Sequence, residues 1–171
     1  MTGYIQVYTG NGKGKTTAAL GLAMRAAGAG LTVMIGQFLK HGEYSEINAL
    51  KAFKDLITVE QYGCGKFVRG APSKEEKESA LRGLERLREN IKKNTYDMII
   101  VEEGNVAVTC GLITENDLLE LMDMKQENME LVVTGRGATQ NIIERADLVT
   151  EMVEIKHYFK SGVAARKGVE K

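Results

Sequence analysis

The segment Tyr4–Thr17 reads YIQVYTGNGKGKTT, and the organisation of this segment decides the fold of the chain around it. A short apolar run comes first, a glycine-rich turn follows it, and a run of small, helix-forming residues begins at Thr16. Glycines allow consecutive backbone N–H groups to point inward at an anion, and a helix N-terminus adds the positive end of its dipole. The segment therefore predicts a phosphate-binding loop between a strand and a helix.

Lys15 and Thr16 supply the chemistry that this loop needs. The lysine offers a mobile positive charge for the outer phosphates of a nucleoside triphosphate, and the threonine hydroxyl is suited to holding Mg²⁺. The usual pattern, G-x-x-x-x-G-K-[ST], has glycine where this chain has Thr9, but three alternating glycines give the turn comparable freedom. A flexible Gly/Lys turn before an ordinary helix is the alternative. The preceding strand and the following helix favour triphosphate binding.

Length and composition predict one domain of an ordinary globular protein. The 171 residues are 43% hydrophobic and 27% charged, and 23 basic residues balance 23 acidic ones. A net charge of zero argues against nucleic acid or a membrane surface as a partner. The two cysteines form no C-x-x-C motif, which disfavours a structural zinc site or a disulfide framework. Strand-like sequence from residue 4 leaves no room for a signal peptide, so the expected location is the cytoplasm.

Apolar strand-like runs alternate with segments of helical period along the whole chain. This alternation predicts an α/β protein with a mostly parallel sheet of about six strands and helices on both faces. With the phosphate loop, the expected architecture is a three-layer P-loop NTPase-like (RecA-like) fold. The expected strands are Tyr4–Thr9, Thr32–Phe38, Ile57–Tyr62, Met98–Glu102, Leu131–Thr134 and Leu148–Ile155.

Two helices have distinct patterns. Thr16–Ala27 is rich in Ala, Gly and Leu nearly all round, which predicts burial on all sides. The segment Ser73–Lys93 is amphipathic and begins with a capping box in which Glu76 follows three residues after the cap. Its expected apolar stripe consists of Leu81, Leu84, Leu87 and Ile91. A similar capping pattern at Thr114 opens a further helix.

Two carboxylates, Glu102 and Glu103, follow directly after the apolar strand that precedes them. In open parallel sheets, ligands bind beyond the carboxyl ends of the strands, so these side chains are expected at the site. The pattern is that of a Walker B segment, in which one carboxylate reaches Mg²⁺ and the next orients a water molecule. The alternative is a pair of solvated acids at a strand end.

Three basic side chains are further candidates. Arg136 lies between two glycines after an apolar strand, where its planar fork suits phosphate oxygens. A surface arginine in a tight turn is the alternative. Arg25, late in the first helix, either extends to solvent or reaches back toward the nucleotide. His157, taken alone, is typical of a plain surface histidine.

These motifs occur together in an order that is similar to a known family. They are TGNGKGKTTAA at 9–19, RAAG at 25–28, QFLK at 37–40, VTGRG at 133–137, ADLVTEM at 146–152 and KH at 156–157. In combination they resemble the P-loop corrinoid (cob(I)alamin) adenosyltransferases of the cobalamin pathway. The resemblance extends over nearly the whole chain and implies that residues 1–171 form a single P-loop nucleotide-binding adenosyltransferase domain.

The resemblance implies transfer of the adenosyl group of ATP to the reduced cobalt of a corrinoid, with release of triphosphate. It also implies a homodimer and a flavoprotein as a candidate reductant. Lys15, Arg136 and Glu103 would act on the reacting nucleotide, and Thr16 and Glu103 would serve Mg²⁺ with Glu102 beside them. The implied ATP-binding residues are Asn11, Gly12, Lys13, Gly14, Lys15, Thr16, Thr17, Arg25, Arg136 and His157.

Two positions depart from the family pattern. Glu102 stands where the family mostly has Asp. The segment Gly63–Phe67 matches a family loop that usually carries a Phe and a Trp near the lower face of the corrinoid. This sequence contains no Trp, so Phe67 is the aromatic residue left in that loop.

Two other classes of function remain open from the residues. One is an ordinary P-loop hydrolase or kinase in which Glu103 positions water or an acceptor hydroxyl. The other is a non-catalytic, ATP-gated corrinoid-binding module. A hydrolase or kinase would release ADP, whereas an adenosyltransferase releases triphosphate. A corrinoid-binding module would form no Co–C bond. The absence of an Asn-Lys-x-Asp motif argues against a GTPase.

Overall fold

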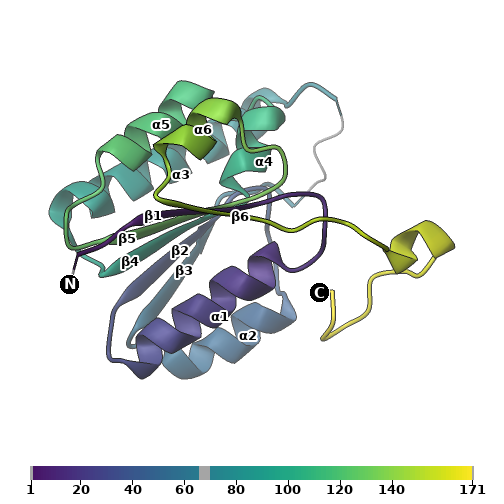
Figure 1. Cartoon of the computed structure of the whole chain (residues 1–171), viewed down its shortest axis with the longest axis horizontal. Helices are drawn as coiled ribbons and strands as arrows, with labels where there is room; N and C mark the ends of the chain where they lie inside the picture. The colour runs from purple at the N-terminus through teal and green to yellow at the C-terminus, as the bar shows by residue number, and fades with distance from the viewer. Residues whose placement is uncertain (1, 66–69, 171) are drawn as a thin grey trace.

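A computed structural model describes residues 2–65 and 70–170, and a parallel sheet of six strands forms its centre (Figure 1). The strand order is β3-β2-β4-β5-β1-β6, and every neighbouring pair is parallel. The predicted α/β class and the number of strands are therefore confirmed. The strands are β1 Ile5–Thr9, β2 Val33–Gln37, β3 Ile57–Gln61, β4 Met98–Glu102, β5 Glu130–Thr134 and β6 Leu148–Glu151.

Helices cover the sheet on both faces, as Figure 1 shows. The helices α1 and α2 lie on one face, and α3, α4, α5 and α6 lie on the other. The helices are α1 Lys15–Gly28, α2 Ser45–Leu50, α3 Lys74–Lys93, α4 Gly104–Thr109, α5 Glu115–Asp123 and α6 Gln140–Arg145, with 3₁₀ turns η1 Lys51–Phe53 and η2 Tyr158–Ser161. Among the helices described, none is both long enough and apolar enough to cross a membrane.

Both faces of the central strands are buried, which explains why their sequences are continuously apolar. In β4, Ile99 and Val101 belong to the core under α3 and α5, whereas Ile100 belongs to the core under α1. β5 divides its side chains in the same way. Complete burial of an aliphatic side chain of this size contributes about 1.5–3 kcal/mol. The sheet is thus held by two hydrophobic cores at once.

The amphipathic helix α3 begins where its cap predicts. The Ser73 hydroxyl accepts a hydrogen bond from the Glu76 N–H at 3.3 Å, and the Glu76 carboxylate accepts one from the Ser73 N–H at 2.7 Å. Leu84 and Leu87 are fully buried, as expected of the apolar stripe. Leu81 is 45% exposed, so its place in that stripe was predicted wrongly. Its neighbour Ala80 is buried in the core, whereas Leu81 points to the side of the helix that carries Glu78, Arg82 and Glu85.

The prediction that the first helix is buried on all sides is wrong for the chain by itself. One stripe of α1, which includes Ala19 and Ala23, packs on the sheet. The opposite face is open, and Met24 there is 50% exposed. The reason is the layer architecture, in which nothing described in this chain packs outside α1.

The last strand is shorter than predicted. It ends at Glu151 because its neighbour β1 ends at Thr9, which leaves no further partner for the ladder. From Met152 onward the chain leaves the sheet and runs away from the helices to the short turn η2, after which it turns back (Figure 1). The predicted residues Phe67 and Lys66 lie outside the described part of the chain.

Two glycines inside helices provide a matched test of this packing. A Cβ atom at Gly83 of α3 would lie 2.3 Å from the buried Tyr62 ring, whereas a Cβ at Gly21 of α1 would meet nothing within 4 Å. We expect Gly83→Ala to lower the free energy of unfolding by about 1–3 kcal/mol through overpacking. Gly21→Ala should raise it by about 0.4–1 kcal/mol. Urea unfolding measures both, and equal effects of the two substitutions would contradict the described packing.

Candidate functional site

The glycine-rich loop joins β1 to α1 and packs against the end of β6. Gly10 and Gly14 have φ values of 91° and 123°, which favour glycine. The Gly12 N–H donates to the Met152 carbonyl oxygen at 2.6 Å, and a Cβ at Gly10 would lie 2.5 Å from the same oxygen. The loop glycines are therefore required by close approach to another backbone as well as by their φ values.

Helix α1 begins at Lys15 in a way that leaves its N-terminus open to an anion. No side chain caps the first turn, and that turn contains no acidic residue. The free N–H groups and the positive end of the helix dipole thus face the loop without internal compensation. Thr16 lies half-buried in the same turn. This geometry agrees with the predicted phosphate site.

The Lys15 side chain is buried and folds back over the loop. Its ammonium group donates to the carbonyl oxygens of Gly10 and Gly12, each at 2.8 Å. Burial lowers the pKa of Lys15, the positive charge of Arg136 lowers it further, and Glu103 opposes both effects. An anion bound in the loop would relieve this charge imbalance.

Glu103 carries a strained backbone at the end of β4. Its φ of 58° places a non-glycine residue in the left-handed region, and its N–H donates to the Thr134 hydroxyl at 3.0 Å. Such strain, which costs of order 1–3 kcal/mol, is found preferentially at functional sites. Burial and the neighbouring Glu102 raise the pKa of Glu103, and Lys40, Lys15 and Arg136 oppose that shift. Glu103 therefore shares one electrostatic environment with the loop lysine and with Arg136.

Glu102, the other member of the acidic pair, is differently placed. Its side chain is 1% exposed, and both carboxylate oxygens are bound within the protein. The Lys40 ammonium group lies 2.7 Å from Oε1, and the Gln37 side-chain amide donates to Oε2. Lys40 is thus a site residue that sequence reasoning did not single out, although it belongs to the QFLK motif.

Arg136 lies exposed between Gly135 and Gly137, whose φ values are 127° and 72°. The Asn105 side chain, fully buried in α4, donates to the Gly135 carbonyl oxygen at 3.1 Å and so fixes this turn. Asn105 was also missed from the sequence. In the sequence, only its position two residues after Glu103 could have indicated that Asn105 lies near the site.

The two remaining basic candidates differ in position. His157 and Arg136 both lie near Glu154, whose pKa is lowered first by its hydrogen bond with Lys160 and further by these two groups. Arg25 lies in the last turn of α1, ten residues and about 15 Å along the helix from Lys15. His157 and Arg136 thus both act on the charge of Glu154, whereas the backbone of Arg25 lies away from the loop.

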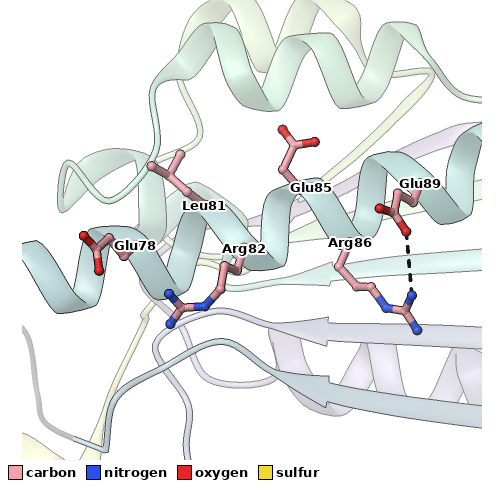
Figure 2. Close-up of a pocket in the computed structure, with 6 residues that line it drawn as sticks. All are labelled: Glu78, Leu81, Arg82, Glu85, Arg86 and Glu89. Atoms are coloured by element: carbon pink, nitrogen blue, oxygen red, sulfur yellow. Dashed lines mark ion pairs between the residues drawn. The ribbon is translucent and has the colours of Figure 1, made fainter.

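The described surface also has a hollow away from these residues (Figure 2). Its volume is about 410 Å³, and all of its lining residues project from α3. Arg86 in this hollow is paired with Glu89 at 3.8 Å and with Glu60 at 3.1 Å. None of the predicted site residues lines it. The strand ends, not this paired helix surface, carry the candidate site.

The oxygen donors at the strand ends suit a magnesium ion that is shared with phosphates. The described residues contain no cluster of three or more His, Cys, Asp or Glu side chains. Mg²⁺ typically takes one or two protein ligands and completes its shell with phosphate oxygens and water. The Thr16 hydroxyl and the Glu103 carboxylate match that requirement, and the latter makes no hydrogen bond or ion pair with any described residue.

The raised pKa of Glu103 predicts a stability effect. The folded protein binds the proton of Glu103 more tightly than the unfolded chain does. Ionisation of Glu103 therefore lowers the free energy of unfolding, and this loss grows as pH rises from the ordinary glutamate range through the raised folded pKa. We expect Glu103→Gln to unfold at a higher urea concentration than the parent protein at pH 7–8, without nucleotide. The difference should disappear near pH 4. A less stable variant at pH 7–8 would contradict this environment.

Comparisons with known proteins identify the family of the chain. A family model described as ATP:corrinoid adenosyltransferase BtuR/CobO/CobP matches residues 1–170. The chain is 32% identical to a corrinoid adenosyltransferase of Escherichia coli K12, over 98% of this chain and 85% of that protein. It is 31% identical to corrinoid adenosyltransferases of Pseudomonas aeruginosa and Salmonella typhimurium, over 98% of this chain and 83% and 85% of theirs. The chain belongs to the ATP:corrinoid adenosyltransferase family.

Proposed function

We propose that the protein transfers the 5′-deoxyadenosyl group of ATP to the reduced cobalt(I) of a corrinoid and releases triphosphate. The observation that carries this proposal is the uncapped N-terminus of α1 with the buried Lys15 in its first turn, together with the Glu103 carboxylate, whose pKa is raised by burial against the opposing charges of Lys15 and Arg136. The match of the family model to nearly the whole chain supplies the reaction class. Residues 1–171 would act as one adenosyltransferase domain.

The loop would hold the triphosphate in this reaction. Backbone N–H groups between Asn11 and Thr17 would bind the anion, except that of Gly12, which is bonded to Met152, and Lys15 would exchange its two carbonyl contacts for phosphate oxygens. Arg136 and His157 would bind from the opposite side of the loop. Thr16 and Glu103 would hold Mg²⁺, which when bound neutralises negative charge on the leaving triphosphate. Arg25 would contact a part of the nucleotide other than the triphosphate.

Nucleophile activation by the protein is not needed, because cobalt(I) is itself a strong nucleophile. Attack on C5′ forms the Co–C bond and breaks the C5′–O bond, and the electron pair leaves with the triphosphate. The protein must orient C5′ toward the metal and stabilise the charge of the leaving group. Lys15 and Arg136 are suited to the second task, because both are cations that follow the carboxyl ends of strands, β1 and β5 respectively.

The charge assignments predict that Lys15→Ala and Arg136→Ala each lower adenosylation by at least about 10²–10³-fold, because each removes a contact to the developing charge. The assay is anaerobic incubation with ATP, Mg²⁺ and chemically reduced corrinoid, followed through the corrinoid spectrum and the phosphate product. Circular dichroism checks the fold, and Lys92→Ala on the exposed face of α3 is the matched control. Near-normal turnover of either site variant, or release of ADP and phosphate, would overturn the proposal.

We further propose that the protein is a cytoplasmic homodimer that receives electrons from a flavoprotein. The dimer is supported by the exposed apolar side chains on β6 and on the outer face of α1, among them Leu148 and Val149 at 45% and 38% exposure and Met24 at 50%. An edge strand that carries aliphatic side chains on both faces is an association surface unless it is covered.

A pair of equally exposed leucines tests the dimer surface. Leu148 on β6 and Leu81 on α3 are both 45% exposed. We expect Leu148→Lys to shift the protein to monomer in sedimentation equilibrium, because it places a charge in the apolar surface. Leu81→Lys should leave the dimer intact. A monomeric parent protein, or equal behaviour of the two variants, would contradict this surface.

A further inference from the structure

We propose that Glu102 is a positioning residue rather than a magnesium ligand, and that through Lys40 it fixes the loop 38–42 against the loop 62–65. This inference rests on the proposed function, because it divides the acidic pair into two roles. Glu103 serves the nucleotide, and Glu102 holds the neighbouring part of the site.

Both oxygens of Glu102 already have partners. The ammonium group of Lys40 lies 2.7 Å from Oε1, the Gln37 amide donates to Oε2, and the side chain is 1% exposed. To ligate a metal beside the triphosphate, this carboxylate would have to leave a buried ion pair and a buried hydrogen bond. Glu103, which follows the last residue of β4, has no such partner among the described residues.

Lys40 is held as firmly as its partner. It contacts Glu46 of α2 at 3.5 Å and lies 5.3 Å from the centre of the Tyr44 ring. Its side chain is 17% exposed. Burial acts to lower the pKa of Lys40, but Glu102 and Glu46 outweigh burial and raise it. The lysine is therefore a fixed cation between β4 and α2.

A chain of hydrogen bonds connects the Glu102 carboxylate through the side chains of Gln37 and Gln61 to the loop 38–42. The Gln61 side-chain amide of β3 donates to the Gln37 side-chain oxygen of β2 at 3.0 Å. The Gln61 oxygen in turn accepts from the Gly42 N–H at 3.0 Å. Side chains at the ends of three neighbouring strands thus hold both sides of the turn around Leu39, whose φ is 62°.

The fixed turn contacts the next loop directly. The Gly63 N–H donates to the Lys40 carbonyl oxygen at 3.0 Å, and a Cβ at Gly63 would lie 2.6 Å from that oxygen. The segment that begins at Gly63 is the one that resembles the corrinoid-facing loop of the family. Glu102 and Lys40 therefore link the nucleotide end of β4 to the side where the corrinoid is expected.

The test uses Glu102→Gln, Lys40→Met and the double variant, because a lysine cannot be a metal ligand in this role. A positioning role predicts that both single variants raise the KM for corrinoid at least fivefold and speed hydrogen exchange at the Gly42 and Gly63 amides at least tenfold. The double variant should be no worse than the single variants, since one interaction is removed. The KM for ATP and the Mg²⁺ concentration that half-saturates nucleotide binding should stay within twofold of the parent protein.

Two further variants calibrate the result. Glu103→Gln should raise the half-saturating Mg²⁺ concentration at least tenfold and leave exchange at Gly63 unchanged. Asp123→Asn, which breaks the exposed pair with Arg145, should change neither quantity. If Lys40→Met fails to fold because it leaves Glu102 unpaired, Glu102→Gln and the double variant give the same comparison.

The proposal is overturned if Glu102→Gln raises the magnesium requirement as Glu103→Gln does while Lys40→Met leaves it unchanged. It is also overturned if exchange at Gly42 and Gly63 is unaffected in all three variants. Failure of the proposed function is a separate outcome. In that case the parent protein forms no Co–C bond, and the exchange rates and Mg²⁺-dependent nucleotide binding still decide between the two roles of Glu102.

Discussion

The close contact between the glycine-rich loop and the backbone of Met152 is the constraint on which the rest of the site depends. The Gly12 N–H bonds to the Met152 carbonyl oxygen, and side chains at positions 10 and 12 would collide with it. The residue that follows β6 therefore fixes the path of the loop backbone. On this path α1 begins at Lys15 with uncapped N–H groups, and these groups form the proposed anion site.

Charges at the strand ends are arranged in two groups that meet at the acidic pair. Lys15 and Arg136 lie on the nucleotide side and influence the pKa of Glu103, whereas Lys40 neutralises Glu102 on the other side. The Glu102 carboxylate is bound within the protein, whereas the Glu103 carboxylate makes no hydrogen bond or ion pair with a described residue. The two neighbouring acids therefore differ in how available they are to a ligand.

Much of the fold could be predicted because its signals are local. The strands are short runs rich in apolar and β-branched residues, and the capping boxes at Ser73 and Thr114 place the starts of α3 and α5. The helices α2, α4 and α6, of six residues each, are too short for a helical period and were missed. Lys40 and Asn105 were missed for another reason, since their partners Glu102 and Gly135 are distant in sequence. The outer face of α1 was misjudged because sequence does not tell whether a second molecule or water covers an apolar face.

The path of the segment 152–170 has a mechanical consequence for the loop. This segment begins at Met152, which is bonded to the proposed anion-binding loop. It continues through Glu154, whose pKa responds to the charges of His157 and Arg136. A ligand that binds better to one arrangement of this segment stabilises that arrangement. By the same coupling, a contact that holds the segment in that arrangement raises the affinity of the loop for the ligand. A change in the arrangement of the residues that follow β6 would therefore alter how tightly the proposed site binds its ligand.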